Sequence, residues 1–158
     1  MDQVLEYLGK GRLFSLFDLV SSFHQLTAHK DTVPLTAFCT PTGLDERLIM
    51  PQGSSASPFF FKVINEVIKG LEPVAAYLDD VIVFDFDPPA HVTTIRALFE
   101  RLGKHNLQLS PSKVRLAATD ADFLGHSISA AGVRPNAGQV SALIKMPMPR
   151  DLKQVCAF

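Results

Sequence analysis

The amino-acid sequence predicts a single α+β domain, and three observations lead to that prediction. The chain has 158 residues, the length of one ordinary domain, and 47% of them are hydrophobic, which is enough for one packed core. Short apolar segments bounded by Gly and Pro have the length of strands, and two longer segments have helical periodicity. The order strand, small sheet, helix, hairpin, helix, strands is typical of the α+β class.

The early part of the chain contains one helix-forming segment and one strand-forming segment. Asp2 can cap a short helix that runs to about Lys10. LFSLFDL, residues 13–19, is an apolar run with the length of a buried strand, so Asp18 should lie near the end of that strand. Three extended segments should follow and form a small antiparallel unit. They are expected around residues 24–28, 35–40 and 45–50.

Two amphipathic helices and an acidic hairpin are predicted in the middle of the chain. One helix should begin near Pro58 and end near Gly70. Its apolar positions are Phe61, Ile64, Ile68 and Leu71. AAYLDDVIVFD has two short apolar arms around an Asp pair, the pattern of a hairpin with an acidic tip. A second helix should run from after Pro89 to near Gly103. Its apolar positions are Val92, Ile95, Leu98, Phe99 and Leu102.

The last third of the chain is predicted to return to strands. LQLSPSKVRLA and DFLGHSISAAGVRP are expected to form strands joined by turns, and residues 136–145 and 150–157 two short helices. No repeat or low-complexity tract interrupts the chain, so one compact domain is the simplest organisation.

The composition argues against a membrane protein and against a secreted one. No segment approaches the roughly 18 consecutive apolar residues that span a bilayer, and the N-terminal residues do not resemble a signal peptide. Cys39 and Cys156 lie far apart, outside any metal-binding spacing, so we expect free thiols in a reducing compartment. The five histidines also lack metal-ligand spacing. We therefore expect an intracellular protein.

Charge is unevenly distributed along the chain, although the net charge is only −1. Residues 1–100 carry 7 Lys and Arg against 13 Asp and Glu, whereas residues 101–158 carry 8 against 3. An acidic first part could hold cations and a basic second part could hold phosphates. Ordinary solvated surface charge gives the same distribution, and composition alone leaves both interpretations open.

Three aspartates form the candidate metal site. Asp79 and Asp80 are adjacent and flanked by apolar residues, so burying both carboxylates is costly unless a cation is present. An acidic pair in a turn is often only a hydrated surface tip. Asp18, at the end of another apolar strand, favours the metal interpretation, because neighbouring strands of one sheet can bring all three carboxylates together. Oxygen ligands suit magnesium, and two such ions about 3.5–4 Å apart catalyse in-line displacement.

Six segments occur in an order that is similar to one known family. They are FDLVSSFHQL, TAFCTPTG, MPQGSSASP, YLDDVIVF, LSPSK and FLGHSIS, and they extend from about Phe14 to the C-terminus. In order and spacing the chain closely resembles the reverse transcriptases of gypsy-type LTR retrotransposons and of retroviruses. The resemblance implies an RNA-directed DNA polymerase with a palm-type antiparallel sheet backed by helices, part of the fingers and the start of the thumb. It implies an RNA or DNA template, a DNA primer, deoxynucleoside triphosphates and two Mg²⁺ ions, with Mn²⁺ as a substitute.

The resemblance also implies roles for the acidic residues and one lysine. Asp18 matches the first catalytic aspartate of the family, and Tyr77-Leu78-Asp79-Asp80 matches its YxDD hairpin, with Tyr77 and Leu78 beside the substrate. Asp79 would be the second main metal ligand and Asp80 an auxiliary acid. Lys113 matches a lysine near the triphosphate that could protonate the leaving group, although a lone Lys after a Ser-Pro turn is more often a surface residue.

Further positions match residues that contact substrate or primer in the family. Phe23 falls where the family has a ring that would clash with a ribose 2′-hydroxyl, although an ordinary core Phe is the alternative. Gln52 matches a contact to the incoming nucleotide and template, and Gly53 would let the backbone approach closely. The alternative is a plain turn before a helix. Phe59, Phe60 and Phe61 are interpreted as core and helix-packing residues, with a base-stacking platform as the alternative.

One more segment matches the hairpin that holds the primer near its 3′ end. It consists of Phe123, Leu124, Gly125 and His126. As bare sequence the segment is a strand that ends in a turn, but it lies in the basic part of the chain, as phosphate contacts require.

The chain departs from the family at both ends. The sequence is interpreted as one truncated domain over residues 1–158, with residues 13–133 as palm and partial fingers and 134–158 as the start of the thumb. Most of the fingers and thumb, the connection and a ribonuclease H domain would belong to a larger polyprotein. The resemblance implies a location in the cytoplasm, in virus-like particles or in the nucleus. An inactive remnant that binds nucleic acid or protein is the alternative function.

Overall fold

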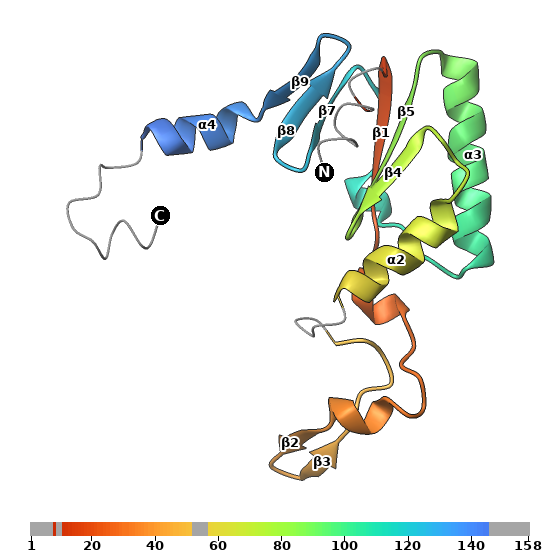
Figure 1. Ribbon diagram of the computed structural model, residues 1–158, viewed down its shortest axis with the longest axis vertical. Coiled ribbons are helices and arrows are strands. Elements are labelled where there is room, and N and C mark those ends of the chain that lie inside the picture. Colours follow the sequence, from red (N-terminus) through yellow and green to blue (C-terminus); the bar gives the residue numbers. More distant parts are fainter. Residues whose placement is uncertain (1–7, 9–10, 52–56, 146–158) are drawn as a thin grey trace.

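A four-stranded antiparallel sheet lies at the centre of the computed structural model, which describes residues 8, 11–51 and 57–145. Its strand order is β4-β5-β1-β6. The strands are β1 (Leu13–Asp18), β4 (Val74–Tyr77), β5 (Asp80–Asp85) and β6 (Arg115–Ala118). The helices α2 (Ser57–Ile68) and α3 (Pro88–Lys104) lie on one side of this sheet, and a second sheet lies on the other (Figure 1). The predicted α+β class is confirmed.

The helices cover one face of the central sheet. Because side chains alternate along a strand, Phe17 of β1 and Val81 and Val83 of β5 point to the same side. They share a buried core with residues of both helices, among them Phe60, Ile64, Leu98 and Leu102. This core packs the helices against the strands. The alternate residues of the strands, such as Asp18 and Asp80, project from the opposite face.

The opposite face is covered over only part of its length. Three strands form the second sheet, namely β7 (Asp120–Phe123), β8 (His126–Ser129) and β9 (Gly132–Pro135). Phe14 of β1 and Ile82 and Phe84 of β5 are buried against Phe123 and other residues of this sheet. Exposure rises along β1 from buried Phe14 through half-buried Leu16 to Asp18. The acids therefore lie at the end of the sheet that the second sheet does not bury.

The two predicted helices form, and most of their predicted apolar positions are buried or packed against the core, with a few exceptions. Asp87 caps α3 through a hydrogen bond from the Ala90 N–H to its carboxylate, and two prolines occupy the first turn. The prediction is wrong for Val92, whose side chain is 56% exposed, whereas Phe99 is 46% exposed and its ring lies 5.4 Å, edge-on, from that of buried Phe17. His91 is buried instead, where its ring makes hydrogen bonds to β1 and β5. A buried polar residue thus sets the rotation of this helix.

In α2 the exceptions are Phe59 and Phe61. Phe60 is fully buried, as are Ile64, Val67 and Ile68, whereas the predicted Phe61 is 37% exposed and Phe59 is 60% exposed. The interpretation of all three phenylalanines as packing residues is therefore correct only for Phe60 and, through a ring contact with Tyr77, partly for Phe61.

Residues 19–51 are less extended than predicted. Residues 22–25 form a short 3₁₀ helix where a strand at 24–28 was expected, and residues 33–36 form another. Two 3-residue strands, β2 (Phe38–Thr40) and β3 (Gly43–Asp45), pair in an antiparallel hairpin, whereas residues 46–50 contribute only a bridge from Ile49 to Thr27. Side-chain hydrogen bonds from Gln25 to the backbone and Pro34 at a helix start compete with strand pairing here.

The remaining elements largely follow the prediction. A 3₁₀ turn over Pro111–Lys113 precedes β6, and β7–β9 occupy the predicted strand region. The helix α4 (Ala137–Ile144) follows β9 and projects from the body (Figure 1). Cys39 is a free, exposed thiol. The predicted helix at 150–157, Cys156 and all but one residue of the predicted helix at 2–10 lie outside the described residues.

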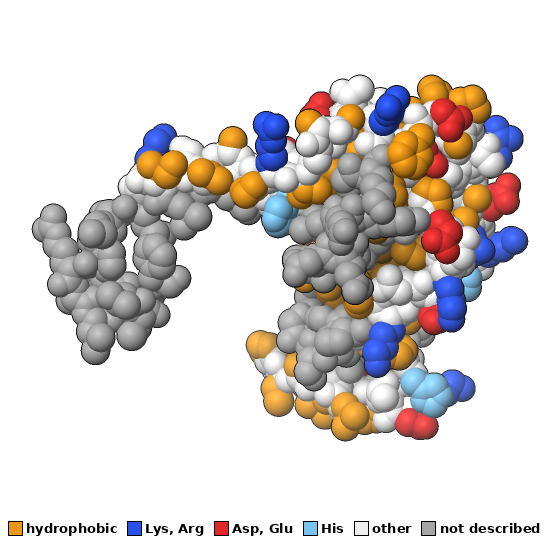
Figure 2. Space-filling view, turned by 45° about the horizontal axis from the view of Figure 1, so that its top comes forward, with side chains coloured by type: hydrophobic (Ala, Val, Ile, Leu, Met, Phe, Trp, Pro, Cys, Tyr) orange, Lys and Arg blue, Asp and Glu red, His pale blue; other side chains and the backbone are white. Residues whose placement is uncertain are grey.

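Several large hydrophobic side chains remain exposed. Some lie near the β2–β3 hairpin and on α4 and others on the body of the molecule, as the orange side chains in Figure 2 show. Near the hairpin the exposed residues include Leu35, Leu44 and Leu48 at 84%, 68% and 68%, and on α4 Ile144 is 79% exposed. Exposed apolar groups of this kind mark contact surfaces. Within the described ranges, no helix combines the length and hydrophobicity needed to cross a bilayer.

Candidate active site

Asp18 and Asp80 lie directly opposite each other at one end of the sheet. β1 and β5 pair in antiparallel register from Leu13 with Asp85 to Asp18 with Asp80. Directly opposed residues project their side chains to the same face, about 4.5–5.5 Å apart at Cβ. A carboxylate of residue 18 on the far side from residues 79 and 80 would have excluded a shared site, and the register places it on the same side.

Asp79 lies in the tight turn between β4 and β5. Tyr77 pairs with Asp80, so Leu78 and Asp79 form the 2-residue loop. Leu78 has a φ of 53°, a left-handed conformation that is uncommon for a residue with a branched side chain. The Leu19 N–H donates to the Asp79 carbonyl at 2.8 Å, so the turn is tied to the chain that leaves β1. The three acids therefore come together from two strands and one turn.

Two polar side chains hold these acids. The Lys113 ammonium lies 3.1 Å from each carboxylate oxygen of Asp18, and the Ser22 hydroxyl donates to Asp79 Oδ1. Lys113 comes from the 3₁₀ turn before β6, and the Ser110 N–H at the start of that turn donates to the Asp18 carbonyl at 2.8 Å. Ser22 was not predicted. Its only sequence signal is its position four residues after Asp18 in FDLVSSFHQL.

The electrostatic environment raises the pKa of Asp80 above its ordinary value. Partial burial of the carboxyl is the main cause, and the negative charges of Asp18 and Asp79 add to it. The Lys113 ammonium acts in the opposite direction and lowers the pKa. The site thus combines partial desolvation of the Asp80 carboxyl with repulsion from two neighbouring acids, and one ammonium opposes both effects on its pKa.

The donor set suits a hard divalent cation, although the carboxylates are not gathered around one point. Among the described residues, no group of three or more His, Cys, Asp or Glu is arranged as a ready metal site. Asp18 is turned to Lys113 and Asp79 to Ser22. All three donors are oxygen atoms, their charges repel one another, and an ammonium already occupies a cation position beside Asp18. Oxygen donors of this kind are chemically compatible with a hard divalent cation.

The predicted substrate residues lie beside the acids where the structure describes them. Phe23 is half-buried in the 3₁₀ helix after β1, with its ring centre 5.3 Å from that of Phe60. Tyr77 and Leu78 are both half-buried at the turn that carries Asp79. Gln52 and Gly53 lie outside the described residues.

The predicted primer segment is a tight turn between β7 and β8. Leu124 and Gly125 have φ values of 52° and 75°, and His126 Nδ1 lies 3.0 Å from the Leu124 carbonyl oxygen. Phe123 is 2% exposed and packs in the core under β1 and β5, so its ring supports the turn from below. Leu124 and Gly125 of the turn and His126 at the start of β8 are half-exposed.

An apolar cavity of about 540 Å³ lies beside this site but shares none of its acids. It is lined by Leu26, Met50, Pro51 and Phe59 and by residues between positions 27 and 36.

Comparison with protein families gives one match over most of the chain. The family model described as reverse transcriptase (RNA-dependent DNA polymerase) matches residues 2–128. The Pol polyprotein of transposon 297 from Drosophila melanogaster is 34% identical over 161 aligned residues, which cover 100% of this chain and 15% of that polyprotein. Polyprotein P3 of Commelina yellow mottle virus is 31% identical and is matched over 85% of this chain and 7% of its own length. The chain thus spans a small part of these relatives.

Solved structures share the fold. The foamy viral protease-reverse transcriptase dRH in complex with double-stranded DNA superposes with a TM-score of 0.90 at 22% identity, covering 98% of this chain and 28% of that one. The same viral protein in complex with an RNA/DNA hybrid gives a TM-score of 0.83, also at 22% identity, covering 97% of this chain and 21% of that one. The predicted sheet backed by helices is therefore the fold of a known polymerase domain.

Proposed function

The chain belongs to the reverse transcriptase (RNA-dependent DNA polymerase) family, and we propose that its three aspartates form the centre of an RNA-directed DNA polymerase. The reaction is transfer of a deoxynucleotidyl group from a triphosphate to the 3′-hydroxyl of a primer. The observation that carries the proposal is the register that sets Asp18 opposite Asp80, with Asp79 in the adjoining turn. A binding role alone would not require three mutually repelling carboxylates at the end of a sheet.

Asp18 and Asp79 would be the main ligands of two Mg²⁺ ions, or of Mn²⁺ in their place, and Asp80 would be the auxiliary acid. When bound, the ions would activate the attacking hydroxyl and stabilise the leaving pyrophosphate. Partial burial and then repulsion from Asp18 and Asp79 raise the pKa of Asp80, and this supports the assignment because a bound cation would offset both effects. Asp79 would give up its hydrogen bond from Ser22 to face the same point as Asp18.

Lys113 would have two successive roles. Its ammonium, 3.1 Å from Asp18, compensates the acidic cluster in the metal-free protein. Its side chain is 65% exposed and long, so it can leave Asp18 without disturbing the core. Once released, it would face the triphosphate and could donate a proton to the leaving group.

Phe23, Tyr77 and Leu78 would shape the nucleotide pocket. The contact of Phe23 with the fully buried Phe60 supports a role as a rigid wall, because a ring held on one side by the core cannot easily turn away from a ribose 2′-hydroxyl. This would favour deoxynucleotides. Gln52 and Gly53 would contact the nucleotide and template.

The turn Leu124–Gly125–His126 would contact the primer strand, with Phe123 as its support. Structures of similar fold contain double-stranded DNA or an RNA/DNA hybrid, which supports an RNA or DNA template and a DNA primer as partners. We further propose that residues 13–133 are palm with part of the fingers and that residues 134–158 begin the thumb. The exposed apolar side chains near β2–β3 and on α4 support contacts there with other segments of a longer polyprotein.

Primer extension tests the proposed function directly. The chain, and a longer polymerase chain that contains it, would be incubated with an RNA template, a DNA primer and each triphosphate, with and without Mg²⁺ or Mn²⁺. Asp79→Asn should lower extension by more than about 100-fold, since loss of even an outer-shell partner of a metal costs about 10–100-fold. Asp31→Asn removes an exposed carboxylate of the same size far from the turn and should leave extension unchanged.

Two results would count against this function. Extension by Asp79→Asn at the rate of the unmodified chain would exclude the metal role of the triad. Binding of primer–template without extension and without a metal requirement, equal in the unmodified chain and in Asp79→Asn, would instead favour a binding module derived from the polymerase.

A further inference from the structure

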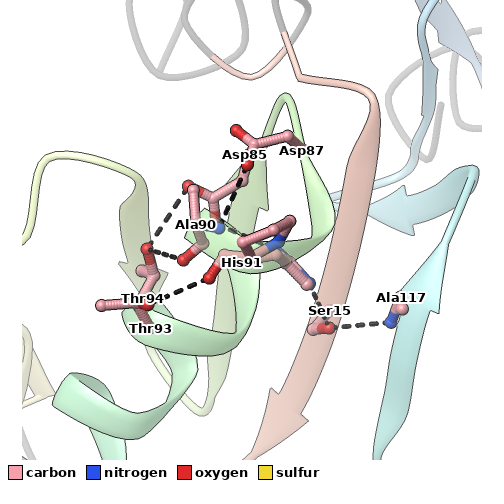
Figure 3. A network of polar contacts seen from close by, with 9 residues as sticks. Ser15, Asp85, Asp87, Ala90, His91, Thr93, Thr94 and Ala117 are labelled. Atoms are coloured by element: carbon pink, nitrogen blue, oxygen red, sulfur yellow. Dashed lines mark hydrogen bonds and ion pairs between the residues drawn. The ribbon is translucent and has the colours of Figure 1, made fainter.

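A buried Ser-His-Asp network joins the central sheet to α3, away from the acidic site. Ser15 Oγ of β1 lies 2.7 Å from His91 Nε2, and His91 Nδ1 lies 2.9 Å from Asp85 Oδ2 at the end of β5. Figure 3 shows the three side chains in line between the strands and the helix. Ser15, His91 and Asp85 are 0%, 2% and 6% exposed, so no substrate can reach the serine and a hydrolytic role is excluded.

The hydrogen bonds of Ser15 define the direction of the network. The Ala117 N–H donates to Ser15 Oγ at 2.9 Å, so the hydroxyl oxygen acts as an acceptor there. Among the contacts described for Ser15, only His91 Nε2 can accept the hydroxyl proton. His91 is then neutral, with its proton on Nδ1, and donates to Asp85. Thr94 Oγ1 donates to the other oxygen of Asp85 at 3.3 Å.

The contact from Ala117 lies at an irregularity in the sheet. β1 and β6 pair at Phe14 with Ala118 and at Leu16 with Arg115, so two residues of β6 stand opposite Ser15 alone. This is a β-bulge. Ala117 has a φ of 49°, a left-handed conformation that an alanine adopts only when its surroundings hold it. The Ser15 hydroxyl supplies the acceptor that the interrupted strand pairing does not.

The bulge affects the register of β6 on β1 and therefore the position of the residues that precede β6, near the acids. Lys113 ends the 3₁₀ turn only two residues before β6 begins, and its ammonium contacts Asp18 three residues after Ser15 on β1. Any change in the register of β6 on β1 would therefore move Lys113 along Asp18.

We propose that the buried Ser15–His91–Asp85 network is a positioning unit that holds the β6 bulge and thereby sets Lys113 against Asp18. Asp85 fixes the His91 ring, the ring orients the Ser15 hydroxyl, and the hydroxyl holds the Ala117 N–H. The importance of that placement for catalysis rests on the function proposed above, but the placement itself is measurable without activity.

The first test needs no substitution. In ¹⁵N spectra of the imidazole groups of the whole chain, His91 should be neutral with the proton on Nδ1. A proton on Nε2 would overturn the proposed order of hydrogen bonds, because the ring would then donate to Ser15 Oγ and the hydroxyl proton would have no acceptor among the described contacts.

The second test uses Ser15→Ala with two controls. Thr93→Ala removes a hydroxyl of α3 that bonds only within the helix, and Val67→Ala creates a cavity in the core between α2 and the sheet. Hydrogen exchange of the Ala117 amide, relative to the Val83 amide of the central strand, should rise about 5-fold in Ser15→Ala, as for one lost hydrogen bond. The ratio should not change in either control. An unchanged ratio in Ser15→Ala would contradict the proposed contact.

The third test measures the placement of Lys113. An amine whose nitrogen is engaged by two carboxylate oxygens reacts slowly with an acylating reagent, so loss of the contact should increase labelling of Lys113. We expect about a 3-fold increase in Ser15→Ala, relative to labelling of Lys104, and a similar increase in Asp18→Asn. If labelling of Lys113 in Ser15→Ala does not exceed that in Val67→Ala, the network contributes only to stability and the proposal is wrong. Failure of the longer chain that contains these residues to extend a primer would refute the proposed function and leave these three measurements valid.

Discussion

The two ends of strand β5 each carry an aspartate, and the surroundings of the two carboxylates differ in burial and in the charge of their neighbours. Asp85 is buried and bonded to His91 and Thr94. Asp80 is exposed and faces two other acids, with Lys113 as the one cation that acts on its pKa. A carboxylate whose partners lie within the fold stabilises it, whereas a carboxylate among like charges is useful only when a cation arrives from outside. The partners of each residue, and not its type, distinguish the structural acid Asp85 from Asp80, the acid that we propose acts with a metal.

The largest expected effect is at the buried end. His91→Leu would leave the Asp85 carboxylate without its main partner and should lower the free energy of unfolding by about 3 kcal/mol. Urea unfolding of both chains measures this loss. His105→Leu, an exposed position at the end of the same helix, should change stability by less than about 0.5 kcal/mol. Equal losses in the two variants would show that the network contributes little.

A smaller effect of opposite sign is expected at the exposed end. Asp80→Asn keeps the shape of the side chain and removes repulsion from Asp18 and Asp79, so the metal-free protein should be stabilised by up to about 1 kcal/mol, given solvent screening. Addition of Mg²⁺ should raise the thermal midpoint of the unmodified chain more than that of the variant, because binding stabilises the folded state. A destabilised metal-free variant would contradict the assigned repulsion.

The same residue predicts a dependence of stability on pH. The pKa of Asp80 is higher in the folded chain than in the unfolded chain, so between the two values the folded state binds more protons. Stability contributed by this group therefore falls as the pH rises through that interval. The advantage of Asp80→Asn should be full above the interval and should vanish below the ordinary pKa of an aspartate. Thermal midpoints of both chains across acidic pH measure the difference, and a constant difference would contradict the raised pKa.

The smallest effect is expected for Lys113→Met. The pair with Asp18 is largely exposed on the lysine side, so its loss should cost less than about 1 kcal/mol in urea unfolding. Since Lys113 lowers the pKa of Asp80, the variant should raise that pKa in the folded chain. The pH interval between the ordinary and the folded-state pKa of Asp80 should then extend to higher pH. Lys69→Met, which removes an exposed pair with Glu66, is the matched control and should leave the interval unchanged.

Local patterns were sufficient to predict the elements that carry the acids. The apolar run that ends at Asp18 specifies a strand, and the two apolar arms around Asp79 specify a hairpin. The prolines in the first turn of α3 specify the start of a helix, and all three elements form. These signals work because each depends on a few neighbouring residues.

The buried network could not be predicted in the same way. Ser15, Asp85 and His91 are 76 residues apart at the widest, and each is a single polar residue in or beside an apolar segment. Their meeting depends on the register of β1 with β5 and on the rotation of α3, which no local pattern specifies. The error over Val92 has the same origin, because apolar spacing alone gives no reason to bury a histidine.

The β6 bulge makes the length of one short segment matter more than its composition. Residues 114–118 contain one residue more than regular pairing with β1 would need. Deleting a single residue there would restore the regular alternation of the strand and turn everything before it by one position, carrying Lys113 away from Asp18. Related polymerases should therefore accept many substitutions in this segment and few insertions or deletions.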